Sequence, residues 1–261
     1  MLNSSKYRDI TIGRGVCSLL GTTIVVYLYV VDGLLIDAGP KRLKRESSKF
    51  FQEHQIDQVA LTHVHEDHSG MAAWLQSKMQ VPIYLHEMSI PEASKRGRYL
   101  FYRQLMWGGR PTFISQPFPE VLTTEKHIFD VIDSPGHMKY HKVFHEKNQG
   151  WLFTGDLYVR PKPFVAFYDE NMKDTIASLQ KLLQLDFDTV FCAHSGVVEN
   201  GKAMLQEKLN YLLNLQEKVE GLRRQGLTDR EVDQKLFPKI PLITKVSRGE
   251  WSSYNIISTI L

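Results

Sequence analysis

The chain has 261 residues, of which 43% are hydrophobic and 23% are charged, as in an ordinary globular protein, and it is long enough for one large domain or a domain with an appendage. The formal net charge of +3 does not by itself indicate nucleic-acid binding, although a sequence pI near 8.7 is compatible with anionic substrates. The two cysteines, Cys17 and Cys192, form no CxxC pair and are interpreted as buried packing residues. This cysteine usage favours a reducing compartment, so we expect a cytoplasmic location.

The first half of the chain alternates strand-like and helix-like segments. The apolar run over residues 19–31 is rich in β-branched residues and too short to span a bilayer, so no membrane segment is expected. Asp32-Gly33 is typical of a tight hairpin between strands at 23–31 and 33–36. Helices are expected over 40–54 and 69–79, and strands over 58–62 and 81–85. Strands that alternate with helices predict an α/β layered fold.

Residues 87–120 interrupt this alternation, because they combine four prolines with several arginines and aromatic residues. We interpret them as an inserted helical cap, named here the cap insert. Strands resume at 128–132, 143–145, 150–154 and 189–193, with a helix over 174–185. Leu205, Leu209, Leu212 and Val219 follow helical spacing, and Thr228 opens a capping-box pattern. The predicted domains are residues 1–200, which include the cap insert, and a helical extension over 201–261.

A dense cluster of metal-ligating residue types follows the strand at 58–62, in the stretch LTHVHEDHSG. His63 and His65 are two apart in extended chain and therefore point to the same side. Asp67 and His68 come where the chain turns into the next helix, and the ligand types suit zinc and similar divalent ions. Glu66 shows no matching role from its spacing and is interpreted as a solvated side chain.

Three further candidates follow other apolar strands and have glycine nearby. His137 lies in DSPGHMKY, Asp156 in WLFTGDLY and His194 in VFCAHSG. This arrangement is expected for a site built on one rim of a sheet. His141 and His145, like His54, His86 and His127, are interpreted as surface histidines or as histidines behind the ligands.

The ordered set of His63, His65, Asp67, His68, His137, Asp156 and His194 resembles the metallo-β-lactamase-fold superfamily, over about the first two hundred residues. The resemblance implies an αβ/βα four-layer sandwich of two mixed β-sheets flanked by helices. It implies one metal on His63, His65 and His137, a second on Asp67, His68 and His194, and Asp156 bridging both. Asp37 resembles the family's aspartate that orients a ligand imidazole, while a simple turn role is the alternative.

Two divalent ions, most simply Zn²⁺ with Fe or Mn as alternatives, can activate a bridging water at neutral pH and polarise a substrate oxygen. Together with this chemistry, the resemblance implies a hydrolase that attacks an ester, thioester or lactone carbonyl. Asp67 is a candidate proton acceptor. Arg103 of the cap insert is a candidate for binding an anionic substrate and Tyr158 for contacting a substrate oxygen, with packing as the alternative for each.

Three other functions stay open at this stage. A ribonuclease or phosphodiesterase of the same fold would use the basic patches, although the small net charge argues against a nucleic-acid partner. A mononuclear-iron persulfide dioxygenase would share part of the ligand set, and a non-catalytic sensor is the third alternative. The substrate is expected to be a small molecule. The oligomeric state is left open, a homo-oligomer included.

Overall fold

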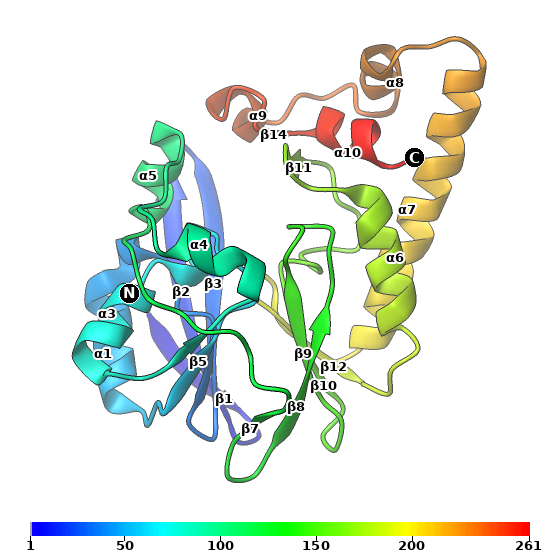
Figure 1. Ribbon diagram of the computed structural model, residues 1–261. Coiled ribbons are helices and arrows are strands. Elements are labelled where there is room, and N and C mark those ends of the chain that lie inside the picture. Colours follow the sequence, from blue (N-terminus) through cyan, green and yellow to red (C-terminus); the bar gives the residue numbers. More distant parts are fainter. Residues whose placement is uncertain (1) are drawn as a thin grey trace.

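Two six-stranded sheets face each other, with helices on the outer side of each (Figure 1). The computed structural model describes residues 2–261. The first sheet has the order β1 (Asn3–Tyr7), β2 (Ile10–Leu19), β3 (Thr22–Val31), β4 (Leu34–Ile36), β5 (Gln58–Ala60) and β6 (Ile83–Tyr84). The second has the order β13 (Gly196–Val198), β12 (Thr189–Cys192), β10 (Trp151–Gly155), β9 (Lys142–Glu146), β8 (Ile128–Asp133) and β7 (Leu122–Thr123).

Both sheets are mixed, because β4, β5 and β6 run parallel, β10 and β12 run parallel, and the other neighbours run antiparallel. The predicted hairpin at Asp32-Gly33 joins β3 to β4, and both turn residues have the positive φ that such a turn requires. The sequence analysis missed β1 and β2. β1 is polar and mostly exposed, and β2 carries two glycines and an arginine, so neither shows a clear apolar pattern.

The core lies in three layers of apolar side chains. Between the sheets, Tyr29 and Ile36 pack with Phe144, Phe153 and other residues of the second sheet. Outside the first sheet lie η1 (Lys41–Leu43), α1 (Lys44–Glu53), α3 (Ala72–Met79) and α5 (Phe101–Trp107). Outside the second sheet lie α6 (Met172–Leu182) and α7 (Gly201–Arg224). The predicted four-layer sandwich is confirmed.

The cap insert contains η2 (Glu87–Ser89), α4 (Ile90–Ala93) and α5, joined by irregular chain. Its helix α5 points toward the end of the molecule that carries α8 (Asp229–Leu236), α9 (Leu242–Val246) and α10 (Ser253–Thr259), at the top of Figure 1, whereas α4 lies nearer the middle. Thr228 and Glu231 form the predicted capping box at the start of α8. No helix within residues 2–261 is both long and apolar enough to cross a membrane.

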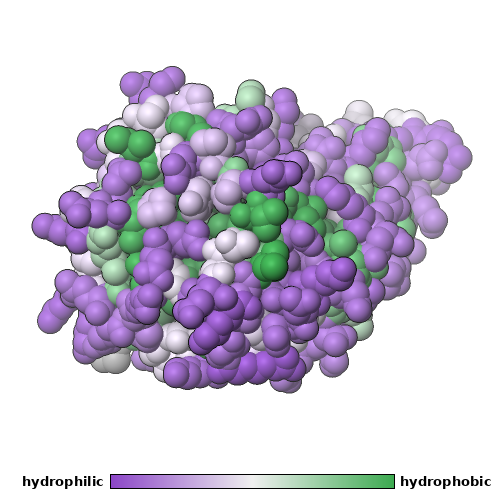
Figure 2. All heavy atoms as spheres, turned by 60° about the horizontal axis from the view of Figure 1, so that its bottom comes forward, coloured by the Kyte–Doolittle hydropathy of each residue, from purple (hydrophilic) through white to green (hydrophobic). Residues whose placement is uncertain are grey.

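The helices after residue 200 share a core with the second sheet. Leu205, Leu212 and Ile257 belong to the same apolar cluster as Leu152 and Val190. In addition, β11 (Ala166–Phe167) pairs with β14 (Trp251–Ser252), so the end of the chain forms a small two-stranded sheet with its middle. A domain boundary at residue 200 stays a prediction. The face seen in Figure 2 is largely hydrophilic, with apolar side chains gathered near its middle.

Candidate metal centre

Seven histidine and aspartate side chains converge in two groups at one end of the sandwich. The first group is His63, His65 and His137, and the second is Asp67, His68, Asp156 and His194, and within each group the possible ligand atoms lie within 4.8 Å of one another. They come from the ends of β5, β8, β10 and β12 and from the short helix α2 (Glu66–Ser69) that follows β5. The structure therefore brings together all seven residues that the sequence singled out.

The first group consists of three buried imidazoles whose nitrogens point at a common position. His65 Nδ1 lies 3.1 Å from His63 Nε2 and 3.1 Å from His137 Nε2. Two nitrogens bound tetrahedrally to one zinc ion are about 3.3 Å apart, given zinc–nitrogen bonds of about 2.0–2.1 Å. The donor spacing fits a divalent ion.

The second group combines two carboxylates with two imidazoles. Asp156 Oδ1 lies 3.3 Å from His68 Nε2 and 3.2 Å from His194 Nε2, and His194 Nε2 lies 3.4 Å from Asp67 Oδ2. His68 Nε2 and Asp156 Oδ1 are buried and face each other, yet within the described chain neither makes a hydrogen bond, with the other or with any third atom. Buried polar atoms are normally satisfied. Two such atoms aimed at one position fit a bound cation that both would contact.

Asp156 faces both groups. Its Oδ1 belongs to the second group, whereas its Oδ2 lies 3.5 Å from His137 Nε2 of the first. One carboxylate with an oxygen toward each group has the arrangement required to bridge two ions.

The other ring nitrogen of each imidazole lies near an oxygen atom, which holds the ring's orientation. His68 Nδ1 donates to Asp37 Oδ2 over 2.8 Å, so this carboxylate is placed to orient the imidazole. The remaining four partners are Thr62 Oγ1 at 3.0 Å from His63 Nδ1, Val25 O at 2.7 Å from His194 Nδ1, Glu170 Oε1 at 3.4 Å from His137 Nδ1 and Asp169 Oδ2 at 3.7 Å from His65 Nε2. Sequence reasoning missed Asp169 and Glu170, whose only signal was two adjacent acids.

The surroundings shift the pKa values of the candidate ligand histidines in opposite directions. Burial disfavours the charged form of His68, but the carboxylates of Asp156, Asp37 and Asp67 outweigh it and raise the pKa of His68 well above its usual value. Burial lowers the pKa of His63 far below its usual value and lowers that of His65 to about 4. Burial therefore favours the neutral, metal-binding form of imidazole for His63 and His65, whereas Glu170 and Asp156 outweigh burial and raise the pKa of His137.

His141 lies directly behind the ligands and is fully buried. Its Nδ1 is 2.8 Å from Ser134 Oγ, and its Nε2 accepts a hydrogen bond from the backbone N–H of Asp156 over 3.4 Å. His145 and His127 are also buried, and His145 Nε2 binds the carbonyl of Asp186. The surface alternative was wrong for these three histidines, because strand β9 and its neighbours enclose them.

Glu66 is fully buried, so its interpretation as a solvated side chain was wrong. Its carboxylate receives two hydrogen bonds from Arg103, at 2.6 and 2.7 Å, and Arg103 also lies 3.6 Å from Glu250 Oε1. Burial raises the pKa of Glu66 to about 7, and the Arg103 guanidinium limits that rise. Arg103 therefore links α5 of the cap insert to the chain beside the candidate ligands. Tyr158 is 3% exposed and packs in the outer core of the second sheet.

Two cavities open beside the centre. The first, of about 1000 Å³, is lined mainly by polar residues of the cap insert and by His65, Tyr168, Asp169 and Glu250. The second, of about 520 Å³, is lined by Asp67, His137, Asp156 and His194 together with a largely apolar wall. The candidate ligands therefore border both cavities.

Comparison with known proteins identifies the family. Residues 21–194 match the Metallo-beta-lactamase superfamily. The chain is 27% identical to the probable metallo-hydrolase YqjP of Bacillus subtilis, over 83% of this chain and 81% of that one, and 29% identical to hydroxyacylglutathione hydrolase of Nitrosomonas europaea, over 77% and 72%. A β-lactamase domain protein from Burkholderia ambifaria has the same fold, with a TM-score of 0.71 and 16% identity over 99% of this chain and 87% of that one. The match over residues 21–194 shows that the chain belongs to the metallo-β-lactamase superfamily, and the two mixed sheets and the convergent histidines and aspartates agree with it.

Proposed function

We propose that the protein is a metal-dependent hydrolase that cleaves an ester, thioester or lactone bond at this centre. The observation that carries the proposal is the convergence of seven side chains in which His68 Nε2 and Asp156 Oδ1 are buried without a hydrogen-bond partner within residues 2–261. The similarity to a hydroxyacylglutathione hydrolase supports an acyl substrate. The two free, buried cysteines fit a reducing compartment such as the cytoplasm.

In this proposal His63, His65 and His137 hold one ion, Asp67, His68 and His194 hold the other, and Asp156 contacts both. Zn²⁺ suits the imidazole and carboxylate ligands, with Fe or Mn as alternatives. The bound ions would supply a nucleophile from water and Lewis-acid polarisation of the substrate carbonyl. The remaining roles in the reaction belong to side chains of the protein.

Asp67 lines the apolar cavity, so its carboxylate faces the position where an acyl group would lie. We assign it a proton-accepting role during turnover in addition to its role as a ligand. Trp107, Phe167 and Trp251 line the same cavity and exclude water from the reacting bond. Asp37 holds the imidazole of His68 in the orientation that turns Nε2 toward Asp156.

The test is a panel of thioester, lactone and phosphodiester substrates offered to protein reconstituted with zinc, iron or manganese. We expect hydrolysis of thioesters or lactones that is abolished by chelation and restored by metal. Asp67→Asn should lower kcat more than it lowers metal content. Phosphodiester cleavage without acyl hydrolysis would favour the nuclease alternative, and oxygen consumption with a persulfide would favour the dioxygenase.

A further inference from the structure

A thin partition separates the two cavities beside the candidate metal centre. Phe167 of β11 stacks on Trp251 of β14, with ring centroids 4.5 Å apart and an interplanar angle of 12°, and both rings line the smaller cavity. Their neighbours Tyr168 and Glu250 line the larger cavity instead. Because His65 lines one cavity and His137 the other, with 3.1 Å between their facing nitrogens, the centre lies where the two cavities approach each other.

The smaller cavity is suited to an apolar group. Its wall is built mainly by four parts of the chain: the β2–β3 hairpin with Ile24, the cap insert with Trp107, residues 159–167 with Phe164 and the exposed Arg160, and the end of the chain with Ile243 of α9 and Trp251 of β14. The one buried cation there, Lys208, donates from Nζ to the carbonyl of Leu157 over 2.6 Å and so is already satisfied. An alkyl or aryl acyl chain fits this lining.

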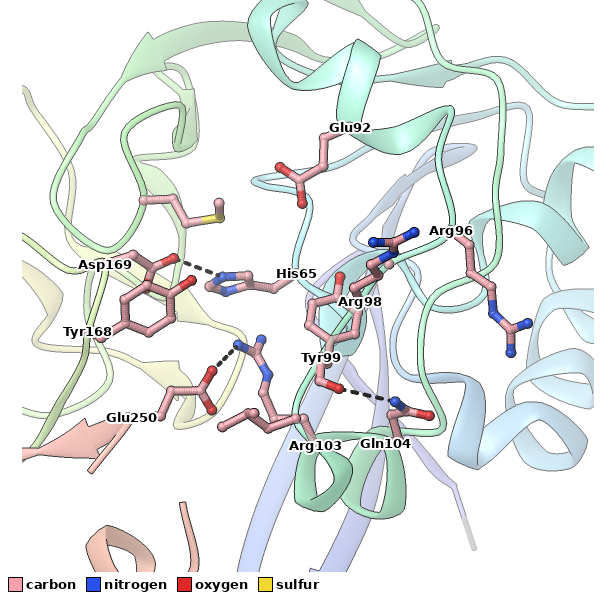
Figure 3. Close-up of a pocket in the computed structure, with 13 residues that line it drawn as sticks. His65, Glu92, Arg96, Arg98, Tyr99, Arg103, Gln104, Tyr168, Asp169 and Glu250 are labelled. Carbon is pink, nitrogen blue, oxygen red and sulfur yellow. Dashed lines mark hydrogen bonds and ion pairs between the residues drawn. The ribbon is translucent and has the colours of Figure 1, made fainter. Parts of the chain in front are cut away.

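The larger cavity has unpaired positive charge at its rim. Arg103 is held by Glu66 and Glu250, and Glu92 lies 3.8 Å from Arg110. Arg96 and Arg98 are exposed and form no ion pair with any carboxylate of residues 2–261, and Figure 3 shows them across the cavity from Asp169 and Tyr168. Exposed Lys95 lines an adjoining hollow with the same two arginines.

Three cations within four residues, with no acidic partner, favour a ligand with more than one negative charge. Arginine binds phosphate through two parallel N–H···O hydrogen bonds, which gives a phosphate group an advantage over a single carboxylate. The cavity volume of about 1000 Å³ leaves room for an extended carrier between the arginines and His65.

We propose, building on the hydrolase function proposed above, that the substrate is an acyl thioester of a phosphate-bearing thiol. The acyl chain occupies the smaller cavity, and the phosphate lies against Arg96 and Arg98 in the larger one. In the reaction the oxygen of water bonds to the acyl carbon, the carbon–sulfur bond breaks, and the leaving sulfur takes a proton. The products are a carboxylic acid and the free thiol, with no change of oxidation state.

The experiment compares three octanoyl thioesters with metal-loaded protein: octanoyl-coenzyme A, octanoyl-phosphopantetheine on a carrier protein, and octanoyl-N-acetylcysteamine, which lacks phosphate. For the double variant Arg96→Ala/Arg98→Ala we expect at least a tenfold rise in KM for the phosphate-bearing substrates, an unchanged kcat and no change for the neutral thioester. A larger rise in KM for octanoyl-coenzyme A than for the carrier protein would identify the coenzyme as the source of the phosphate, and the reverse would identify the carrier protein. Binding of coenzyme A by calorimetry gives a readout that does not depend on hydrolysis, and the double variant should weaken it by the same factor.

A matched control is Arg45→Ala/Arg230→Ala, which removes two exposed arginines outside both cavities and changes the net charge equally. Hydrolysis of all three thioesters with equal effects of the two double variants would overturn the phosphate assignment and leave the hydrolase function intact. Failure to hydrolyse any thioester, combined with coenzyme A binding that depends on Arg96 and Arg98, would overturn the thioester assignment and retain the anion site, while the lactone substrates of the panel above test the hydrolase function separately. Absence of both activities would overturn both.

Discussion

The buried pair of Glu66 and Arg103 connects the cap insert to the candidate centre, and its removal should be costly. In Arg103→Met the aliphatic side chain can still pack on Phe167, which the guanidinium now covers at 4.9 Å from the ring centroid. However, the substitution leaves a fully buried carboxylate at Glu66 without its two hydrogen bonds. Removing one partner of a buried ion pair typically costs about 3–5 kcal/mol, so we expect a loss of that size.

Removing the charge of the other partner should lower the free energy of unfolding by less. In Glu66→Gln, Arg103 keeps Glu250 at 3.6 Å, and the glutamine carbonyl can still accept one hydrogen bond, so the expected cost is about 1.5–3 kcal/mol. The double variant Glu66→Gln/Arg103→Met contains neither buried charge. Its loss of unfolding free energy should be smaller than the sum of the two single losses, by about 1–3 kcal/mol.

The assay is urea unfolding of all four proteins with chelator present, so that metal binding does not contribute to the free energy of unfolding. Circular dichroism of the folded state serves as the control for global structure. Additive costs, or a loss below about 1 kcal/mol for Arg103→Met, would refute the reasoning that the two residues compensate each other inside the protein.

Three further predictions concern residues around the centre. Asp37→Asn should weaken metal binding about 10–100-fold in a chelator competition, because His68 loses the carboxylate that orients it, and an unchanged affinity would contradict this role. Gly155→Ala should reduce both stability and metal content, because Gly155 has φ +48° and an added Cβ would lie 2.7 Å from Thr62 Oγ1; wild-type metal content would refute this. Burial lowers the pKa of Lys208, so its unfavourable charge in the folded state is lost as pH rises toward the usual lysine value. The stability of wild type relative to Lys208→Met should therefore increase from pH 7 to pH 10, and a difference independent of pH would contradict this.

The sequence predicted the fold class and the members of the centre, because short-range patterns carry both. Alternation of strands with helices follows from local periodicity, and the candidate ligands come directly after apolar strands whose ends meet at one rim. Asp37, which follows β4 directly, was singled out by the resemblance to the family and not by its local pattern, which equally suggested a turn.

What the sequence could not reveal depends on contacts between distant segments. Glu66 is buried against Arg103 of the cap insert, 37 residues later in the chain. No local sequence pattern predicts that pairing. Asp169 and Glu170 follow β11, which pairs with β14 near the end of the chain, and they meet histidines that come from distant parts of the sequence. The strands β1 and β2 were missed because glycines and polar residues obscure their alternation, and pairing with β3 determines their structure.

The most direct test of the account is the metal content of the protein. Elemental analysis of metal-loaded wild type, His137→Ala and His194→Ala, after removal of loosely bound ions, measures how many ions each chain retains. We predict two divalent ions per chain in the wild type and one in each variant, since His137 and His194 belong to different groups. A wild type that retains one ion or none, or variants that retain two, would contradict the proposed two-metal centre.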